Sequence, residues 1–160
     1  MKKIPFFTQP LFLLGISLLL YITALSLPAL TFKIVEHRAM HTNSIYIMKG
    51  LEVTAWGILG LLFLQWPAIG WLANPLYWFS CVLFAYKKYK LSTAAAFISI
   101  ILGFAGTISA YWLALPNGSN PYSHMILTKL LPGFWLWLAA PAFLMIISGI
   151  ADWKYRNRLV

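Results

Sequence analysis

The chain has 160 residues, of which 61% are apolar and 9% are charged, and its mean hydropathy is +0.79. Soluble domains carry about 25% charged residues, so this composition excludes an ordinary soluble protein. A net charge of +9 suggests nucleic-acid binding in a soluble chain, but here Lys and Arg flank apolar stretches, as in the cytoplasmic loops of membrane proteins. We therefore expect one transmembrane domain over residues 1–160 and no nucleic-acid partner.

Almost no ionisable side chains occur in four long stretches, residues 4–32, 53–86, 91–128 and 130–151. Each stretch reaches or exceeds the ~20 apolar residues that cross a bilayer core, so the lipid bilayer is the first expected partner. The first stretch predicts a helix over residues 10–30. Lys2 and Lys3 before it also match the start of a secretory signal, but the apolar run is longer than in most signals, and we expect a retained helix.

The second stretch is too long for one crossing, because residues 53–86 would reach about 51 Å as a helix at 1.5 Å per residue. Pro67 and Pro75 flank the expected break, since proline cannot continue a helix. Asn74 is a good N-terminal cap for a helix that starts at Pro75. The sequence therefore predicts a helical hairpin formed by residues 45–66 and 75–88.

Two further helices are predicted over residues 91–114 and 131–152, and Pro141 predicts a kink within the second of them. The predicted fold is therefore all-α, a polytopic transmembrane bundle of five helices. The alternative has four crossings, in which the second stretch forms one broken or re-entrant span.

The distribution of positive charge is compatible with both counts. Five crossings place the loop 31–50, the turn 87–90 and the C-terminal tail on one side, with nine of the twelve Lys and Arg. Four crossings join the N-terminus with the same turn and tail, which together carry eight of the twelve. Both counts put the C-terminus in the cytoplasm, and we prefer five crossings.

Only three acidic residues occur, Glu36, Glu52 and Asp152, and none lies in the middle of a predicted span. Proton-coupled transporters usually need an ionisable group buried among the helices, so this pattern disfavours a proton-driven pump. The sequence has no paired cysteines, no Gly-rich phosphate loop and no recognisable catalytic set. It therefore favours a protein that is not an enzyme, with no catalytic residues to name.

His37 and His41 form the sharpest local pattern among the polar residues. If this segment is helical, their spacing places both imidazoles on one face, where they could bind a metal ion or haem iron. Such a site needs further ligands, and Glu36 or His124 would have to complete it. The other interpretation is a solvated loop, for which no cofactor is expected.

Small residues follow one face of the predicted helix 91–114, including Ser99, Gly103 and Gly106. Gly57 and Gly60 are expected to face them from the second stretch. In lipid, small residues allow helix backbones to approach closely. The sequence therefore predicts a packing seam, either within one chain or between copies of it.

The most distinctive motif is Trp-Leu-Ala-Asn-Pro at residues 71–75. Together with the order and spacing of residues 27–30, 57–62 and 131–138, it makes most of the chain similar to a group of small bacterial inner-membrane proteins. This resemblance implies a multi-pass protein of the bacterial inner membrane, and it implies no activity.

The sequence as a whole favours a structural or accessory role, exerted through helix contacts with a second copy or with a partner complex. We therefore expect a homo-oligomer or a subunit of a larger membrane complex. Two alternatives stay open: a redox, metal-binding or haem-binding protein that uses His37 and His41, and a small transporter or channel built by oligomerisation.

Overall fold

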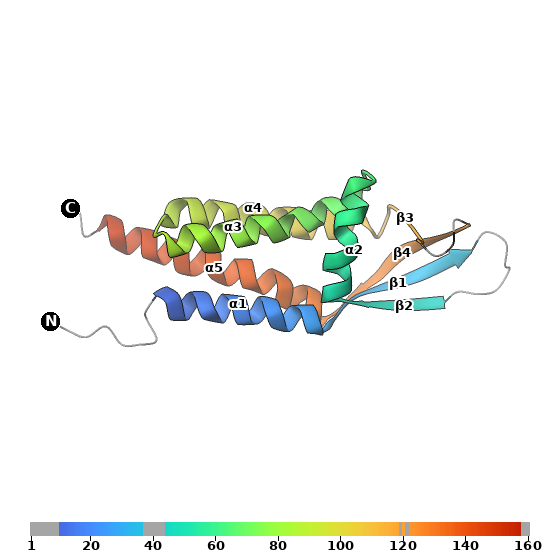
Figure 1. Cartoon of the computed structure of the whole chain (residues 1–160), viewed down its shortest axis with the longest axis horizontal. Coiled ribbons are helices and arrows are strands. Elements are labelled where there is room, and N and C mark those ends of the chain that lie inside the picture. Colours follow the sequence, from blue (N-terminus) through green and yellow to red (C-terminus); the bar gives the residue numbers. More distant parts are fainter. Residues whose placement is uncertain (1–9, 37–43, 119, 121, 158–160) are drawn as a thin grey trace.

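The computed structural model describes residues 10–36, 44–118, 120 and 122–157. Within them, helices lie side by side along the long axis, and a sheet extends from one end of this bundle (Figure 1). The helices are α1 (Pro10–Ser26), α2 (Gly50–Leu62), the 3-10 helix η2 (Trp66–Leu72), α3 (Ala73–Ala85), α4 (Tyr89–Ser109) and α5 (Pro132–Arg156). The strands are β1 (Pro28–Glu36), β2 (Ser44–Lys49), β3 (Leu115–Pro116) and β4 (Ser123–Leu130).

Three helical segments are long and apolar enough to cross a membrane: Trp66–Ala85, which joins η2 to α3, and the helices α4 and α5. The described part of α1 has 17 residues and packs along α5. Side-chain hydrogen bonds link these helices. Ser80 of α3 is hydrogen-bonded to Ser92 of α4, and Thr93 of α4 is hydrogen-bonded to Ser148 of α5. Lipid offers no partners for polar groups, so such internal pairing is required inside a membrane.

The prediction of a mainly helical fold with five helices is confirmed by α1 to α5. Its all-α class is wrong, because the chain also forms a four-stranded antiparallel sheet in the order β2-β1-β4-β3. Its central pair, β1 and β4, runs from Leu30 opposite Leu130 to Glu36 opposite Ser123. One residue separates α1 from β1, and one separates β4 from α5. Apolar strands that adjoin apolar helices read as one apolar stretch, which is why the predicted helix over residues 10–30 included the start of β1.

The predicted hairpin over residues 45–66 and 75–88 is also wrong. Residues 45–49 belong to β2, and α2 then crosses the end of the bundle (Figure 1). The chain reverses just after α2, where Leu64 has a φ of 55°. Pro67 lies in the first turn of η2, where proline is tolerated, and Pro75 lies near the start of α3. Both prolines therefore lie within one helical segment instead of flanking a turn.

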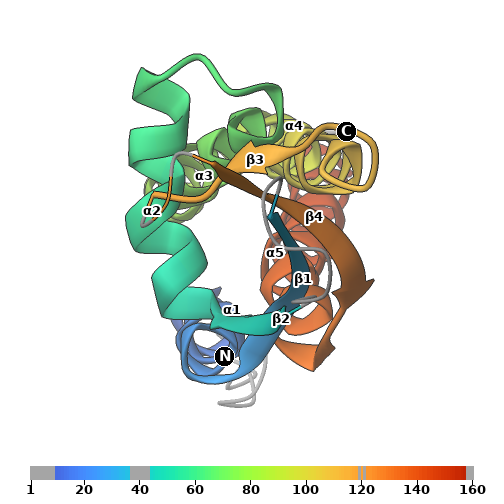
Figure 2. The same cartoon turned by 90° about the vertical axis from the view of Figure 1, so that its right-hand side faces the viewer.

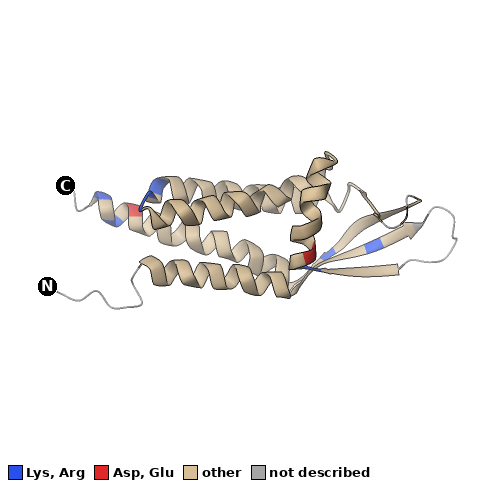
Figure 3. Ribbon diagram, in the orientation of Figure 1, with Lys and Arg blue, Asp and Glu red and all other residues tan. Residues whose placement is uncertain are grey.

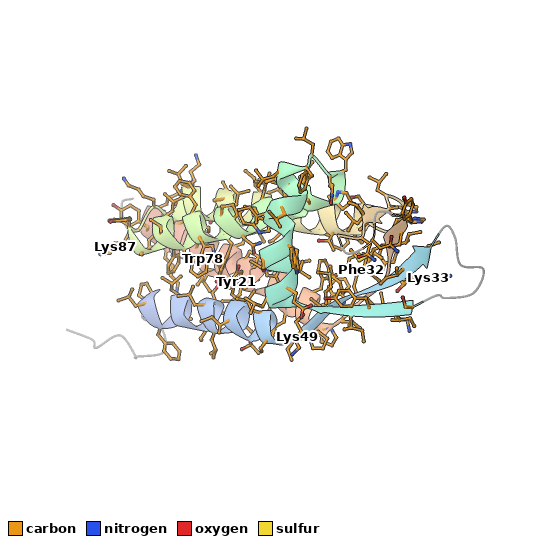
Figure 4. All side chains as sticks on the ribbon, turned by 45° about the vertical axis from the view of Figure 1, so that its right-hand side comes forward. Tyr21, Phe32, Lys33, Lys49, Trp78 and Lys87 are labelled. Carbon is orange, nitrogen blue, oxygen red and sulfur yellow. The ribbon has the colours of Figure 1, made fainter. Side chains whose placement is uncertain are left out.

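The described helices are arranged as the four-crossing alternative expects, and the number of crossings stays a prediction. α1 begins and α5 ends at one end of the bundle, whereas α2 and the sheet lie at the other (Figure 1). Lys33 and Lys87 lie at opposite ends of the molecule (Figure 4). Among the described residues, Lys and Arg are confined to these two ends, and the middle of the bundle carries none (Figure 3). This is the charge distribution expected of a bundle that crosses a bilayer.

The bundle and the sheet are joined where three parts of the chain meet around Leu27 and Pro28. The amide of Gly50 donates a hydrogen bond of 3.0 Å to the Leu27 carbonyl, and a side chain at Gly50 would overlap the carbonyl oxygen of Ala24. On the other side, a Cβ atom at Gly133 would lie 2.7 Å from the Pro28 carbonyl oxygen. Only glycine permits such close approach. These two glycines therefore fix where α2 and α5 leave the sheet.

The residues predicted to form a packing seam on α4 lie inside the molecule. Ser99 donates a hydrogen bond of 2.8 Å to the Ala73 carbonyl, and a Cβ atom at Gly103 would lie 3.1 Å from the Cβ atom of Ala73. Gly106 lies against the backbone of Gly70, so closely that a Cβ atom would overlap it. The seam therefore joins α4 to η2 and α3 within one chain.

Gly57 and Gly60, expected to face this seam, lie instead against η2. The closest side chains to them are Trp71 and Ala68, respectively. Pro141 lies inside α5 and is buried there, as the sequence places it. The α2 glycines therefore bring a short helix close to η2 and do not extend the seam.

The described arrangement predicts that Ser44 and Lys90 lie on opposite sides of the membrane. Both side chains are exposed, so cysteines introduced there in a Cys81→Ser background should react with a membrane-impermeant thiol reagent from one side only. In intact cells we expect labelling at position 44 and protection at position 90. Five crossings place both positions on the same side, so equal labelling would contradict the four-crossing arrangement.

Gly106→Ala should destabilise the protein by about 1–3 kcal/mol, because the added methyl group overlaps the Gly70 backbone. Gly15→Ala is the matched control in α1, since a Cβ atom there would meet nothing within 4 Å. We expect the control to be neutral or stabilising by up to about 1 kcal/mol, as alanine is the better helix former. Thermal unfolding in detergent measures both, and similar Tm values for the two variants would exclude the tight contact.

Candidate functional site

A cavity with a volume of about 1130 Å³ lies where the bundle meets the sheet. Residues of α2 and of all four strands line it, and Figure 2 shows α2 on the left and β1 and β4 on the right of this end of the molecule. The ends of α1 and α4, the start of α5 and the helix η2 also contribute to the lining, as does Asn74 of α3. The glycines at the junction, Gly50 and Gly133, also line it. The cavity therefore depends on the same close contacts that join the two parts of the fold.

No Lys, Arg, His, Asp or Glu occurs among the described residues that line the cavity. Its surface is mainly apolar and aromatic, with Phe32, Trp71 and Phe134 among the larger side chains. The polar side chains in the lining are uncharged amides and hydroxyls: Tyr46, Thr54, Gln65, Asn74, Thr107 and Asn117. Apolar walls with a few placed polar groups are typical of small-molecule sites in proteins.

Asn74 is the most buried polar side chain of this lining, with 6% of its surface exposed. Its Oδ1 accepts hydrogen bonds of 2.9 Å from the Tyr21 hydroxyl and of 2.9 Å from Trp137 Nε1. An indole N–H can only donate, so the atom facing Trp137 must be the amide oxygen. Asn74 thereby joins α1, α3 and α5 at the wall of the cavity.

The amide nitrogen of Asn74 has a different environment. No hydrogen bond joins Nδ2 to another described residue, although Oδ1 has two. Every fully enclosed side-chain nitrogen or oxygen in the described structure has a hydrogen-bond partner. Nδ2 is therefore not fully enclosed, and since Asn74 lines the cavity, we infer that a donor faces this space.

A second layer of contacts holds the Asn74 partners in place. The rings of Tyr21 and Tyr77 stack with centroids 5.0 Å apart, and Tyr21 meets Trp78 edge-on at 5.3 Å, between α1 and α3 (Figure 4). The Tyr77 hydroxyl lies 2.9 Å from Ser17 Oγ, which donates to the Ala140 carbonyl. These contacts fix the side chain of Tyr21 and, through it, the orientation of the Asn74 amide.

The outer walls are also held by hydrogen bonds. Trp71 Nε1 donates a hydrogen bond of 2.7 Å to the Thr54 carbonyl, which ties η2 to α2. At the rim, the Tyr46 hydroxyl donates to Glu52 Oε2 at 3.3 Å. Burial and the nearby Glu52 carboxylate raise the pKa of Tyr46 above its ordinary value of 10.0. This hydroxyl is therefore neutral at physiological pH, and the lining carries no charge.

Four residues singled out by the sequence line this cavity: Gly57, Gly60, Pro67 and Asn74. The spacing predicted Asn74 as a helix cap beside Pro75, but it lies inside the segment Trp66–Ala85 and bonds two other helices. Tyr21 and Trp137 were not expected at the site. Tyr21 lies 53 positions before Asn74 in the sequence, and Trp137 lies 63 positions after it. No local sequence pattern indicates such distant pairing.

The proposed metal ligands His37 and His41 lie outside the described residues, so the metal or haem hypothesis stays a prediction. His124 lies in β4, opposite Val35 of β1. In the described ranges, no group of three His, Cys, Asp or Glu side chains is placed to hold a metal ion.

Comparison of the chain with protein-family models, with curated protein sequences and with solved structures gives no match. The class of protein therefore follows from the fold and the cavity alone. It is a helical protein with three segments able to cross a membrane, a small antiparallel sheet at one end and an uncharged cavity between the two.

Asn74→Ala should lower the free energy of unfolding by about 2–5 kcal/mol, because it leaves two buried donors, Tyr21 Oη and Trp137 Nε1, without their acceptor. Tyr21→Phe removes one donor and leaves the Trp137 bond intact, so we expect a loss of about 0.5–1.5 kcal/mol. Denaturant titration in detergent micelles gives both values. The reverse order of the two losses would show that Asn74 does not join the helices.

Proposed function

We propose that this chain is an accessory protein of the bacterial inner membrane that holds one uncharged, lipid-like molecule in the cavity between its bundle and its sheet. In this proposal it crosses the membrane four times, its C-terminus is cytoplasmic, and it carries out no chemical reaction itself. Its contribution to the membrane is to bind this molecule, alone, as an oligomer or within a larger complex.

The observation that carries the proposal is the size of the cavity together with its lack of charge. A volume of about 1130 Å³ exceeds the roughly 300–1,000 Å³ of pockets that hold drug-sized ligands. Burying an ion among apolar side chains is costly unless an opposite charge pairs with it, and the described lining offers no such charge. An uncharged, largely apolar molecule is the occupant that fits both properties.

The position of the cavity supports a molecule that comes from the membrane. When α3, α4 and α5 cross the bilayer, the junction with the sheet lies near one membrane surface. α2 then lies across the bundle at this level (Figure 1), where amphipathic helices and aromatic side chains meet lipid head groups. A molecule dissolved in the bilayer reaches such a cavity without passing through water.

The same features favour a binding protein over a transporter driven by ions. Ion-coupled transport needs ionisable groups among the helices, and the described bundle interior carries no Lys, Arg, Asp or Glu (Figure 3). The seam on α4 is used within the chain, so contacts with a second copy or a partner would use other, lipid-facing surfaces.

Val53→Trp tests the proposal, because Val53 lines the cavity and a larger side chain there would occupy part of it. The matched control is Leu51→Trp on the same helix, which lies outside the lining and is 61% exposed. Purified wild-type protein and the control should each retain about one uncharged lipid molecule per chain in organic extracts analysed by mass spectrometry. Val53→Trp should retain several-fold less.

Equal lipid content in Val53→Trp, the Leu51→Trp control and the wild type would exclude the cavity as the binding site. Absence of any stoichiometric uncharged lipid from the wild type would contradict the proposed function directly.

A further inference from the structure

We propose, on the basis of the proposed function, that the bound molecule is a lipid with a carbonyl oxygen on an apolar chain, and that Asn74 Nδ2 donates a hydrogen bond to this oxygen. Two classes of membrane compound have this chemistry: fatty acyl esters and prenylated quinones. Both are uncharged, and both carry a carbonyl group next to a long hydrocarbon.

The Asn74 side chain can offer a ligand a hydrogen-bond donor but no acceptor. Asn74 Oδ1 already accepts from Tyr21 and Trp137, and these two bonds use both of its lone pairs. The amide can therefore only donate to a ligand. A carbonyl oxygen is an acceptor that brings no donor of its own, so it needs nothing more from this part of the cavity.

An unpaired donor with little access to water also favours a ligand that accepts a hydrogen bond. Only 6% of the Asn74 surface is exposed, and a polar group largely removed from water without a partner is destabilising. A ligand that accepts from Nδ2 recovers this loss, whereas a pure hydrocarbon does not. The site is thus expected to prefer a carbonyl compound over a hydrocarbon of the same length.

An apolar surface offers a hydrocarbon chain a way to reach this donor. α2 has no buried residue, and Trp56 in α2 and Phe63 directly after it line the cavity while being 59% and 74% exposed. An apolar rim therefore continues from the outside of the molecule into the cavity. A hydrocarbon chain lying along this rim would place its polar end toward the buried Asn74.

The walls around Asn74 suit the apolar part of such a ligand. Trp71, Phe134 and Trp137 line the same space, and the indole N–H groups of the two tryptophans are used elsewhere, on Thr54 and on Asn74 itself. These aromatic residues therefore present apolar surface to a ligand, and the Asn74 amide remains the directed donor among them.

The test compares matched probes on the full-length protein in detergent micelles. Methyl oleate is paired with octadecene, and a prenylated naphthoquinone is paired with squalene, so that each carbonyl compound has a hydrocarbon counterpart. Native mass spectrometry gives the dissociation constant of each probe. We expect at least one carbonyl compound to bind about tenfold more tightly than its counterpart, and the pair that shows this preference identifies the source.

Asn74→Asp is the companion variant, because it keeps an oxygen for Tyr21 and Trp137 and replaces the amide donor with a second oxygen. At alkaline pH, where the carboxylate is ionised, the preference for the carbonyl compound should disappear. A preference retained in this variant would overturn the assignment of Nδ2. The wild-type comparison decides the carbonyl claim even if the variant does not fold.

The two proposals fail in different ways. If all four probes bind the wild type with equal affinity and Val53→Trp weakens them together, the carbonyl inference is wrong and the proposed function stands. If no probe binds the wild type, both are wrong.

Discussion

The close approach of Gly50 and Gly133 to the chain at residues 24–28 is the contact on which the rest of the structure depends. Backbone meets backbone at this junction, so any side chain larger than hydrogen at either glycine would push α2 or α5 away. The pairing of β1 with β4 continues the contact of α1 with α5 beyond this point. The sheet is thereby attached rigidly to the bundle, and α2 is held across its end with space behind it.

The helical part of the fold could be predicted because crossing a bilayer requires long apolar segments. The predicted helices 91–114 and 131–152 correspond closely to α4 (Tyr89–Ser109) and α5 (Pro132–Arg156). The sheet could not be predicted, since a single residue separates β1 from the apolar helix α1 and β4 from the apolar helix α5. The pairing of these two strands also joins residues almost a hundred positions apart, such as Leu30 and Leu130, and no local pattern indicates it.

The candidate site was only partly accessible to sequence reasoning, for the same physical reason. The sequence predicts Asn74 as a helix cap, because an amide before proline suits that position. In the fold, Asn74 instead accepts hydrogen bonds from residues of two other helices, α1 and α5. Gly57 and Gly60 were recognised as positions of close approach, yet their neighbours lie in η2. The residue types of Asn74, Gly57 and Gly60 indicate positions that matter for packing. The residues that they contact are determined by the tertiary structure.

The fully enclosed side-chain polar atoms of the described structure are all paired, whereas the Asn74 amide nitrogen has no partner and lies at a cavity without charged side chains. The most direct measurement is a crystal structure of the protein purified in mild detergent without added ligand. The account predicts continuous electron density for one apolar molecule between α2 and the sheet, ending within hydrogen-bond distance of Asn74 Nδ2. A cavity filled by the protein's own side chains, or by water alone, would contradict it.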